Sequence, residues 1–154
     1  KMATTVTTAT LQVDVVENIT LNGITYDKTT TNSIASIAQY SVRVMQLAAS
    51  GNHAVYTAAA SPAGSAHDSD DVRYIRITNL DDTNPVTVSI NSAGNDAVAL
   101  NLIAGASIVL FDDKIEGNAT GGAITTQPLT SVVDSIYVTT SANETDIELV
   151  TASV

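Results

Sequence analysis

The densest group of side chains that could do chemistry is the run from His67 to Asp71. Its three carboxylates, Asp68, Asp70 and Asp71, are the type of oxygen ligand that a divalent cation prefers. The spacing is not that of an EF-hand loop, which requires a glycine and a distant glutamate in register. Runs of like charge are commonly solvated, so we interpret the segment as an exposed acidic loop. A cation site is the alternative.

Groupings that could support catalysis do not converge in this sequence. Ser65 and His67 would supply a nucleophile and a base, but no Gly-x-Ser-x-Gly elbow surrounds Ser65. Two carboxylate pairs, at 81–82 and 112–113, come at the ends of expected strands. Adjacent strand residues point to opposite faces, and aspartate commonly forms turns, so we interpret both pairs as turn residues. We therefore predict no catalytic residues, no cofactor and no enzymatic activity.

Composition restricts the class of partner. The 154 residues fit one domain, and there is no cysteine to form a disulfide. A net charge of −10 repels nucleic acid and anionic lipid, so neither is expected as a partner. The first residues also lack the apolar stretch of a signal peptide, so we expect none. Only 14% of residues are charged, and much of the surface is expected to be small and uncharged, which suits contact with other subunits.

Alternation of apolar and polar residues predicts an all-β chain. Thr, Val and Ile dominate the regular stretches, and the pattern repeats every two residues. The expected strands lie near 10–21, 40–47, 72–80, 85–91, 97–103, 106–111, 131–139 and 146–151, with a short one near 54–57. The expected inward side chains are Val13, Ile75, Ile77, Val88, Leu100, Leu110, Ile136 and Leu149. The apolar run 107–111 is typical of a strand buried on both faces.

Turn signals divide these strands. Asn22-Gly23 predicts a tight hairpin, with a return strand that starts at Ile24 and ends before a polar loop at 29–33. The segment 34–47 fits a bulged strand or, near 36–40, a helical turn; we favour a strand for 40–47. Long polar loops are expected at 58–71 and 112–127. Together these features predict one domain, residues 1–154, with the fold of an antiparallel β-sandwich or jelly roll and an N-terminal arm at 1–10.

Along most of its length, in its strand-turn-strand sequence patterns, the chain resembles structural proteins of tailed bacteriophages, especially small β-rich head proteins of marine phages. The stretches that carry this resemblance are 17–23, 34–37 with 42–45, 73–80 with the turn that follows, and 100–107 leading to 133–138. The resemblance implies a virion protein, with a capsid decoration (cement) protein preferred. Such a protein would assemble in the host cytoplasm, bind the major capsid protein or other virion subunits, and form homo-oligomer or lattice contacts.

Interface residues are expected in two kinds of place. Exposed tyrosines and their strand neighbours supply Tyr74, Arg76 and Tyr137, whereas Thr4, Val6 and Thr8 alternate along the N-terminal arm. That arm could add a strand to the open edge of a neighbouring sheet, with help from the loops at 58–71 and 112–127. The alternative function is a carbohydrate- or cell-surface-binding β-sandwich module, for example of a phage tail.

Overall fold

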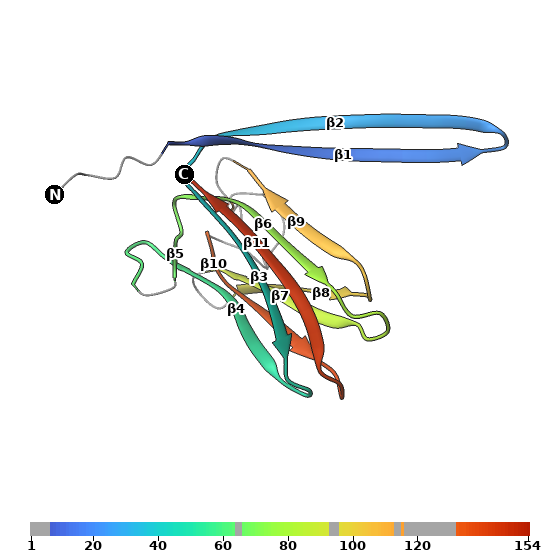
Figure 1. Ribbon diagram of the computed structural model, residues 1–154. Coiled ribbons are helices and arrows are strands. Elements are labelled where there is room, and N and C mark those ends of the chain that lie inside the picture. Colours follow the sequence, from blue (N-terminus) through green and yellow to red (C-terminus); the bar gives the residue numbers. More distant parts are fainter. Residues whose placement is uncertain (1–6, 64–65, 93–95, 113–114, 116–131) are drawn as a thin grey trace, which may run out of the picture.

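The fold is a β-sandwich from which a long two-stranded hairpin projects (Figure 1). A computed structural model describes residues 7–63, 66–92, 96–112, 115 and 132–154. Its strands are β1 (Ala9–Leu21), β2 (Ile24–Ile37), β3 (Gln39–Leu47), β4 (Asn52–Ala59), β5 (His67–Asp68), β6 (Val72–Asn79), β7 (Val86–Ser92), β8 (Asp96–Leu102), β9 (Ser107–Phe111), β10 (Val133–Thr140) and β11 (Thr145–Ser153). These described residues include no helix that could cross a membrane. The prediction of an all-β antiparallel sandwich is confirmed.

The two sheets of the sandwich divide the strands between them. One sheet has the order β5-β4-β10-β7-β8, and the other has the order β3-β11-β6-β9. Every pairing is antiparallel except that of β4 with the two-residue β5. Within the described parts of the chain, strands β1 and β2 pair only with each other and form the hairpin.

The core lies between the two sheets and follows the predicted alternation. In β7, and in β6 from Ile75 on, every second residue is buried, because one face of each strand meets the other sheet. Five expected inward residues are fully buried: Ile75, Ile77, Val88, Ile136 and Leu149. A sixth, Leu110, is half-buried and packs against this core.

The prediction of inward side chains was wrong for two residues, Leu100 and Val13. Leu100 pairs with Val88 and shares its face, but it lies on the edge strand β8 and is 44% exposed. Val13 is only half-buried because it belongs to the hairpin and not to the sandwich. The expectation that residues 107–111 are buried on both faces is also wrong. Strand β9 is an edge strand whose Ser107 and Val109 are exposed.

The stretch from Ile24 to Leu47 is more regular than predicted. The expected polar loop at 29–33 lies inside β2, where its residues pair with β1. The alternative of a helical turn near 36–40 is wrong, since Ala38 alone separates β2 from β3. A register shift where Ala9 pairs with Ile37, together with a left-handed Ser36 (φ 64°), agrees with the predicted bulge.

The two expected long loops differ in how much of them is described. The segment 58–71 is partly strand, because β4 extends to Ala59 and β5 occupies His67 and Asp68. Most of 112–127 lies outside the described residues, as do Thr4 and Val6 of the expected arm. The prediction that these parts contact neighbours stays a prediction.

The turn between β6 and β7 is held by an aspartate, as predicted for the Asp81-Asp82 pair. The Asp81 carboxylate accepts hydrogen bonds from the backbone N–H groups of Thr83 and Asn84, at 2.8 and 2.7 Å. These bonds, the one from Asn84 first, hold the pKa of Asp81 below its ordinary value of 3.8.

This lowered pKa predicts a pH-dependent contribution to stability. A carboxyl group whose pKa is lower in the folded state stabilises the fold above its ordinary pKa, and this contribution disappears as pH falls through the folded value. The urea-unfolding free energies of the wild type and Asp81→Asn should therefore differ at pH 6 and converge as pH falls below about 3.8. A gap that stays constant over that range would contradict the assignment.

Candidate interaction surfaces

The hairpin turn is built by Asn22 and Gly23. Both residues have positive φ angles, 51° and 79°, as a type I′ turn requires at its two central positions. The strands then pair without interruption from Leu21 opposite Ile24 back to Leu11 opposite Ile34. The Asn-Gly prediction is therefore confirmed, and the hairpin is much longer than the sequence pattern indicated.

The pairing register gives the hairpin one apolar and one polar face, because directly opposite residues share a face. On the apolar face lie Leu11, Val13, Val15, Ile19, Leu21, Ile24, Tyr26 and Ile34. A Glu17–Lys28 cross-strand pair interrupts it. Apart from Val16, the opposite face between Gln12 and Thr20 is polar, and there the Asp14 carboxylate accepts hydrogen bonds from Thr31 and Gln12.

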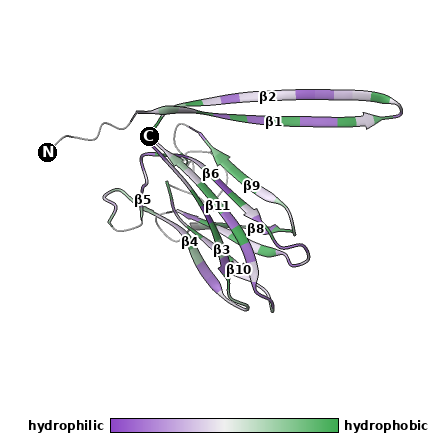
Figure 2. Cartoon of the chain, viewed as in Figure 1, coloured by the Kyte–Doolittle hydropathy of each residue, from purple (hydrophilic) through white to green (hydrophobic). Residues whose placement is uncertain are grey.

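The far end of the apolar face has no partner among the residues that the structure describes. Four side chains gather next to the turn, and we call them the tip cluster: Ile19, Leu21, Ile24 and Tyr26, which are 56%, 58%, 57% and 56% exposed. Figure 2 shows hydrophobic residues recurring along β1, whereas β2 is hydrophobic only towards its two ends. A two-stranded hairpin is at best marginally stable alone in water, so this one is expected to gain stability from a further contact.

The base of the hairpin is attached to the sandwich. Ile37 is buried there, and the backbone N–H of Ala38 donates a 2.9 Å hydrogen bond to the Ser153 carbonyl. The end of β9 also approaches β2, since residues 32–34 line one depression with Phe111 and Asp112. The attached base fixes where the hairpin starts, and the tip cluster lies at the opposite end (Figure 1).

A second exposed apolar surface lies on the outer face of the four-stranded sheet. The registers place two rows side by side across the sheet, Val42-Val150-Arg76-Val109 and Tyr40-Ala152-Tyr74-Phe111, with Val44 beside Glu148 in the next row. Tyr40, Val42 and Val44 of the edge strand β3 are 61%, 50% and 65% exposed. We call these three rows the outer face. Val150 and Ala152 in its middle are buried, although they are not part of the hydrophobic cluster packed between the two sheets.

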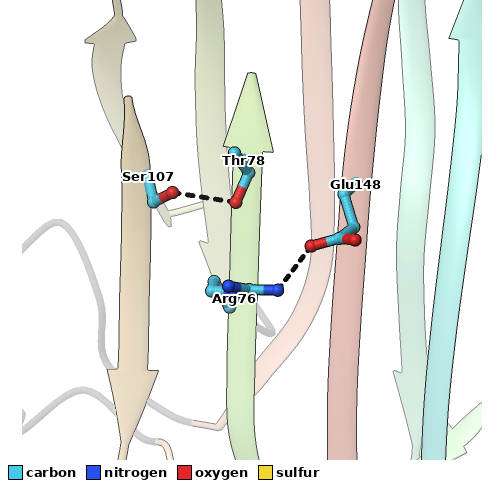
Figure 3. A network of polar contacts seen from close by, with 4 residues as sticks. All are labelled: Arg76, Thr78, Ser107 and Glu148. Atoms are coloured by element: carbon cyan, nitrogen blue, oxygen red, sulfur yellow. Dashed lines mark hydrogen bonds and ion pairs between the residues drawn. The ribbon is translucent and has the colours of Figure 1, made fainter. Parts of the chain in front are cut away.

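Polar contacts organise one side of the outer face. The Arg76 guanidinium donates a hydrogen bond to the Glu148 carboxylate on the neighbouring strand, and Thr78 bonds to Ser107 at 2.8 Å (Figure 3). The ion pair is partly exposed, and such pairs contribute little to stability. Burial raises the pKa of Tyr74, which stands one row away. Two sequence-predicted interface residues, Tyr74 and Arg76, therefore lie together on this face.

Tyr137, which was predicted as an interface residue together with Tyr74 and Arg76, lies on the opposite sheet. It pairs with Ser89 of β7 and Ala54 of β4, so it faces away from the core on the five-stranded sheet. There it lines a shallow depression of about 380 Å³ whose other residues are polar: Asn52, Ser89, Asn91, Ser92, Asp134 and Ser135. The structure does not bring Tyr137 together with Tyr74 and Arg76.

The acidic segment is more ordered than an exposed loop. The Asp68 carboxylate accepts a 3.0 Å hydrogen bond from the Asp70 backbone N–H, and Ser69 is buried. The His67 ring stacks on Tyr56 with centroids 5.2 Å apart, and burial lowers the pKa of His67. Within the described parts of the chain, no three His, Asp or Glu side chains are placed to hold a metal ion. Ser65 lies outside those parts.

Sequence reasoning missed the hairpin as a candidate interface and assigned that role to the N-terminal arm. Of the arm's three named residues, only Thr8 is described; it is exposed and just precedes β1. The available signal was the alternation of Leu11 to Leu21 continuing through Ile24 and Tyr26. Apart from Val16, it places the large apolar residues of this two-stranded unit on one face.

Comparisons with known proteins give little further information. No protein-family model matches the chain, and no curated protein matches it. One similar solved structure comes from work on Bacillus endospore appendages, described as a novel family of disulfide-linked pili. It shares 15% identity over 75% of this chain and 84% of that chain, with a TM-score of 0.45.

Proposed function

We propose that this chain is a non-catalytic structural subunit of a multi-subunit particle, and specifically a capsid decoration protein of a tailed bacteriophage. The observation that carries the proposal is the projecting hairpin with its uncovered tip cluster. In this role the hairpin and the outer face bind neighbouring subunits, including the major capsid protein. The phage assignment rests on the sequence resemblance.

The energetics of the hairpin support an assembly role. Fully burying a large apolar side chain is worth about 1.5–3 kcal/mol. Each side chain of the tip cluster is a little over half exposed, so covering it would contribute on the order of 1 kcal/mol. A contact of this kind is strong enough to position a subunit, and its repetition over a particle would make the attachment stable.

The order of the strands also supports the proposal. Without the short β5, the described part of the sandwich has eight strands in two groups of four, β3-β11-β6-β9 and β4-β10-β7-β8. Chain order alternates between the groups except at β7 and β8, which are hairpin neighbours in one group. We interpret this order as a jelly roll, an eight-stranded architecture common among viral capsid and lectin domains. The link from fold to function is an analogy.

Analysis of purified phage particles would test the proposal. Mass spectrometry with copy counting should find the chain at on the order of hundreds of copies per particle, whereas a ring in the tail or connector would give about 6 to 12. Recombinant protein added to particles that lack the chain should restore occupancy. The variant Leu21→Thr/Ile24→Thr should bind much less, and Val16→Thr on the polar hairpin face should bind normally. Absence of the chain from particles would refute the proposal.

A second candidate is a carbohydrate-binding module, which the depression around Tyr137 favours. Amide, hydroxyl and carboxylate groups there surround an aromatic ring, and such groups are the ones that bind sugar hydroxyls and sugar faces. A glycan array separates the two functions. Binding that is lost in Tyr137→Ala and kept in Leu21→Thr/Ile24→Thr would favour sugar recognition, and a decoration protein should bind no glycan.

A further inference from the structure

The tip cluster and the outer face are two exposed apolar surfaces that one copy of the chain does not bring together. The hairpin starts at its attached base near Ile37 and runs away from the sandwich to the turn at Asn22 (Figure 1). The tip cluster consequently lies at the end of the hairpin that is far from its own outer face. The described residues of the same copy leave the tip cluster and the outer-face side chains Tyr40, Val42 and Val44 more than half or about half exposed, so a second copy could cover them.

We propose that the tip cluster of one copy docks on the outer face of a second copy. This inference rests on the proposed function and names the first binding partner as the chain itself. A single contact of this type covers both apolar surfaces. Pairing of two tips, by contrast, would leave Tyr40, Val42 and Val44 exposed on every copy.

The charges on the two surfaces are complementary. Glu17 and Lys28 lie opposite each other directly behind the tip cluster and on the same hairpin face. The outer face carries the Arg76–Glu148 pair beside its exposed valines. Each surface thus presents one acid and one base next to its apolar part. A docked hairpin can place Glu17 near Arg76 and Lys28 near Glu148, and such pairs determine orientation more than affinity.

The size of the contact indicates that a single docking event is weak. From Leu11 to Leu21 the hairpin is about 35 Å long at about 3.3 Å per residue, and its two strands make it roughly 10 Å wide. The tip cluster occupies only the far end of this face, so docking covers at most about 350 Å² on each partner. The total of roughly 700 Å² is below the about 1,200 Å² typical of stable complexes. Subunits should stay separate when dilute and associate when many contacts form together.

The symmetry of the contact follows from the two surfaces being different. A contact between unlike surfaces repeats head to tail and produces a closed ring or an open filament. A single contact leaves one tip and one outer face free, and these either pair reciprocally within the same two copies or bind further copies. The proposal therefore predicts concentration-dependent self-association that requires both surfaces.

Sedimentation velocity of the full chain over a concentration series tests this prediction. Wild type should self-associate into dimers or larger species as concentration rises. The tip variant Leu21→Thr/Ile24→Thr and the face variant Val42→Thr/Val44→Thr should each remain monomeric. Threonine keeps the strand propensity at all four positions. Val16→Thr, on the polar hairpin face, is the matched control and should assemble as wild type does.

Mixing the two variants gives a sharper outcome. An equimolar mixture should form dimers and nothing larger, because the intact tip of the face variant can dock only on the intact face of the tip variant. If the face variant alone assembles like wild type while the tip variant does not, tips pair with tips and the proposal is wrong. It is also wrong if wild type is monomeric throughout.

Cysteine trapping covers the case in which a threonine variant fails to fold. The chain has no cysteine of its own, so single introduced thiols report a chosen contact. Leu21→Cys mixed with Val44→Cys should give disulfide-linked heterodimers, and dominant Leu21→Cys homodimers would contradict the docking. Particle incorporation is measured separately. If wild type is monomeric but still enters particles, only this inference is wrong. If wild type self-associates but never enters particles, only the decoration role is wrong.

Discussion

Ile77→Ala is expected to lower the free energy of unfolding by about 2–5 kcal/mol, the usual cost of truncating a large buried aliphatic side chain. Ile77 is 2% exposed and lies in β6 between Leu149 of β11 and Ile108 of β9. Its removal leaves a cavity in the middle of the sandwich that the two sheets can close only in part. Urea denaturation of the purified protein measures the loss.

The neighbouring residue supplies the control for this prediction. Thr78 points to the outer face, where its hydroxyl bonds only to the exposed Ser107 hydroxyl among the described residues. Thr78→Ala should therefore change stability by no more than about 0.5 kcal/mol. Equal losses for the two variants would mean that the assignment of faces in β6 is wrong.

Asn79→Ala is the second substitution with a large expected effect, again about 2–5 kcal/mol of unfolding free energy. The Asn79 side chain is fully buried at the end of β6. Its amide donates hydrogen bonds to the carbonyls of Asn84 and Leu102, at 2.8 and 3.2 Å, and its oxygen accepts one from the Asp81 N–H. Alanine would leave these three backbone groups without that partner, and each buried group left unsatisfied costs about 1–3 kcal/mol.

Asn101→Ala is the matched control, because Asn101 is an exposed asparagine in strand β8 of the other sheet. Its loss should change stability by no more than about 0.5 kcal/mol. Thermal unfolding followed by circular dichroism compares the two variants directly. An Asn79→Ala protein as stable as Asn101→Ala would show that water replaces the buried amide without cost.

The sandwich was predictable because its strands and turns are specified by local sequence patterns. Alternation in the segments around Ile77 and Val88 determines which side chains face inward, and Asn22-Gly23 specifies its turn without reference to the rest of the chain. What alternation does not contain is a strand's position in its sheet. Leu100 has the pattern of a core residue, and only its place on the edge strand β8 exposes it.

The hairpin was only half predictable for a similar reason. Strand β1 carries the apolar alternation, whereas the middle of β2, from Lys28 to Ser33, is polar and reads as a loop. It is a strand because β1 supplies its hydrogen-bond partners. In the described parts of the chain, no third strand pairs with this hairpin. This depends on the whole topology, so local sequence patterns could not identify the candidate interface.

The distance along the chain between paired strands also determines when each surface comes into existence during folding. Hairpin strands joined by a two-residue turn meet within about 1–10 μs. Strand β3 pairs with β11, and their partners lie about 100 residues apart, so this sheet forms late. The outer face needs β3, β11, β6 and β9 all in place. An incompletely folded molecule therefore has no outer face on which a tip could dock. The slow step of folding would delay self-association until fully folded subunits have accumulated.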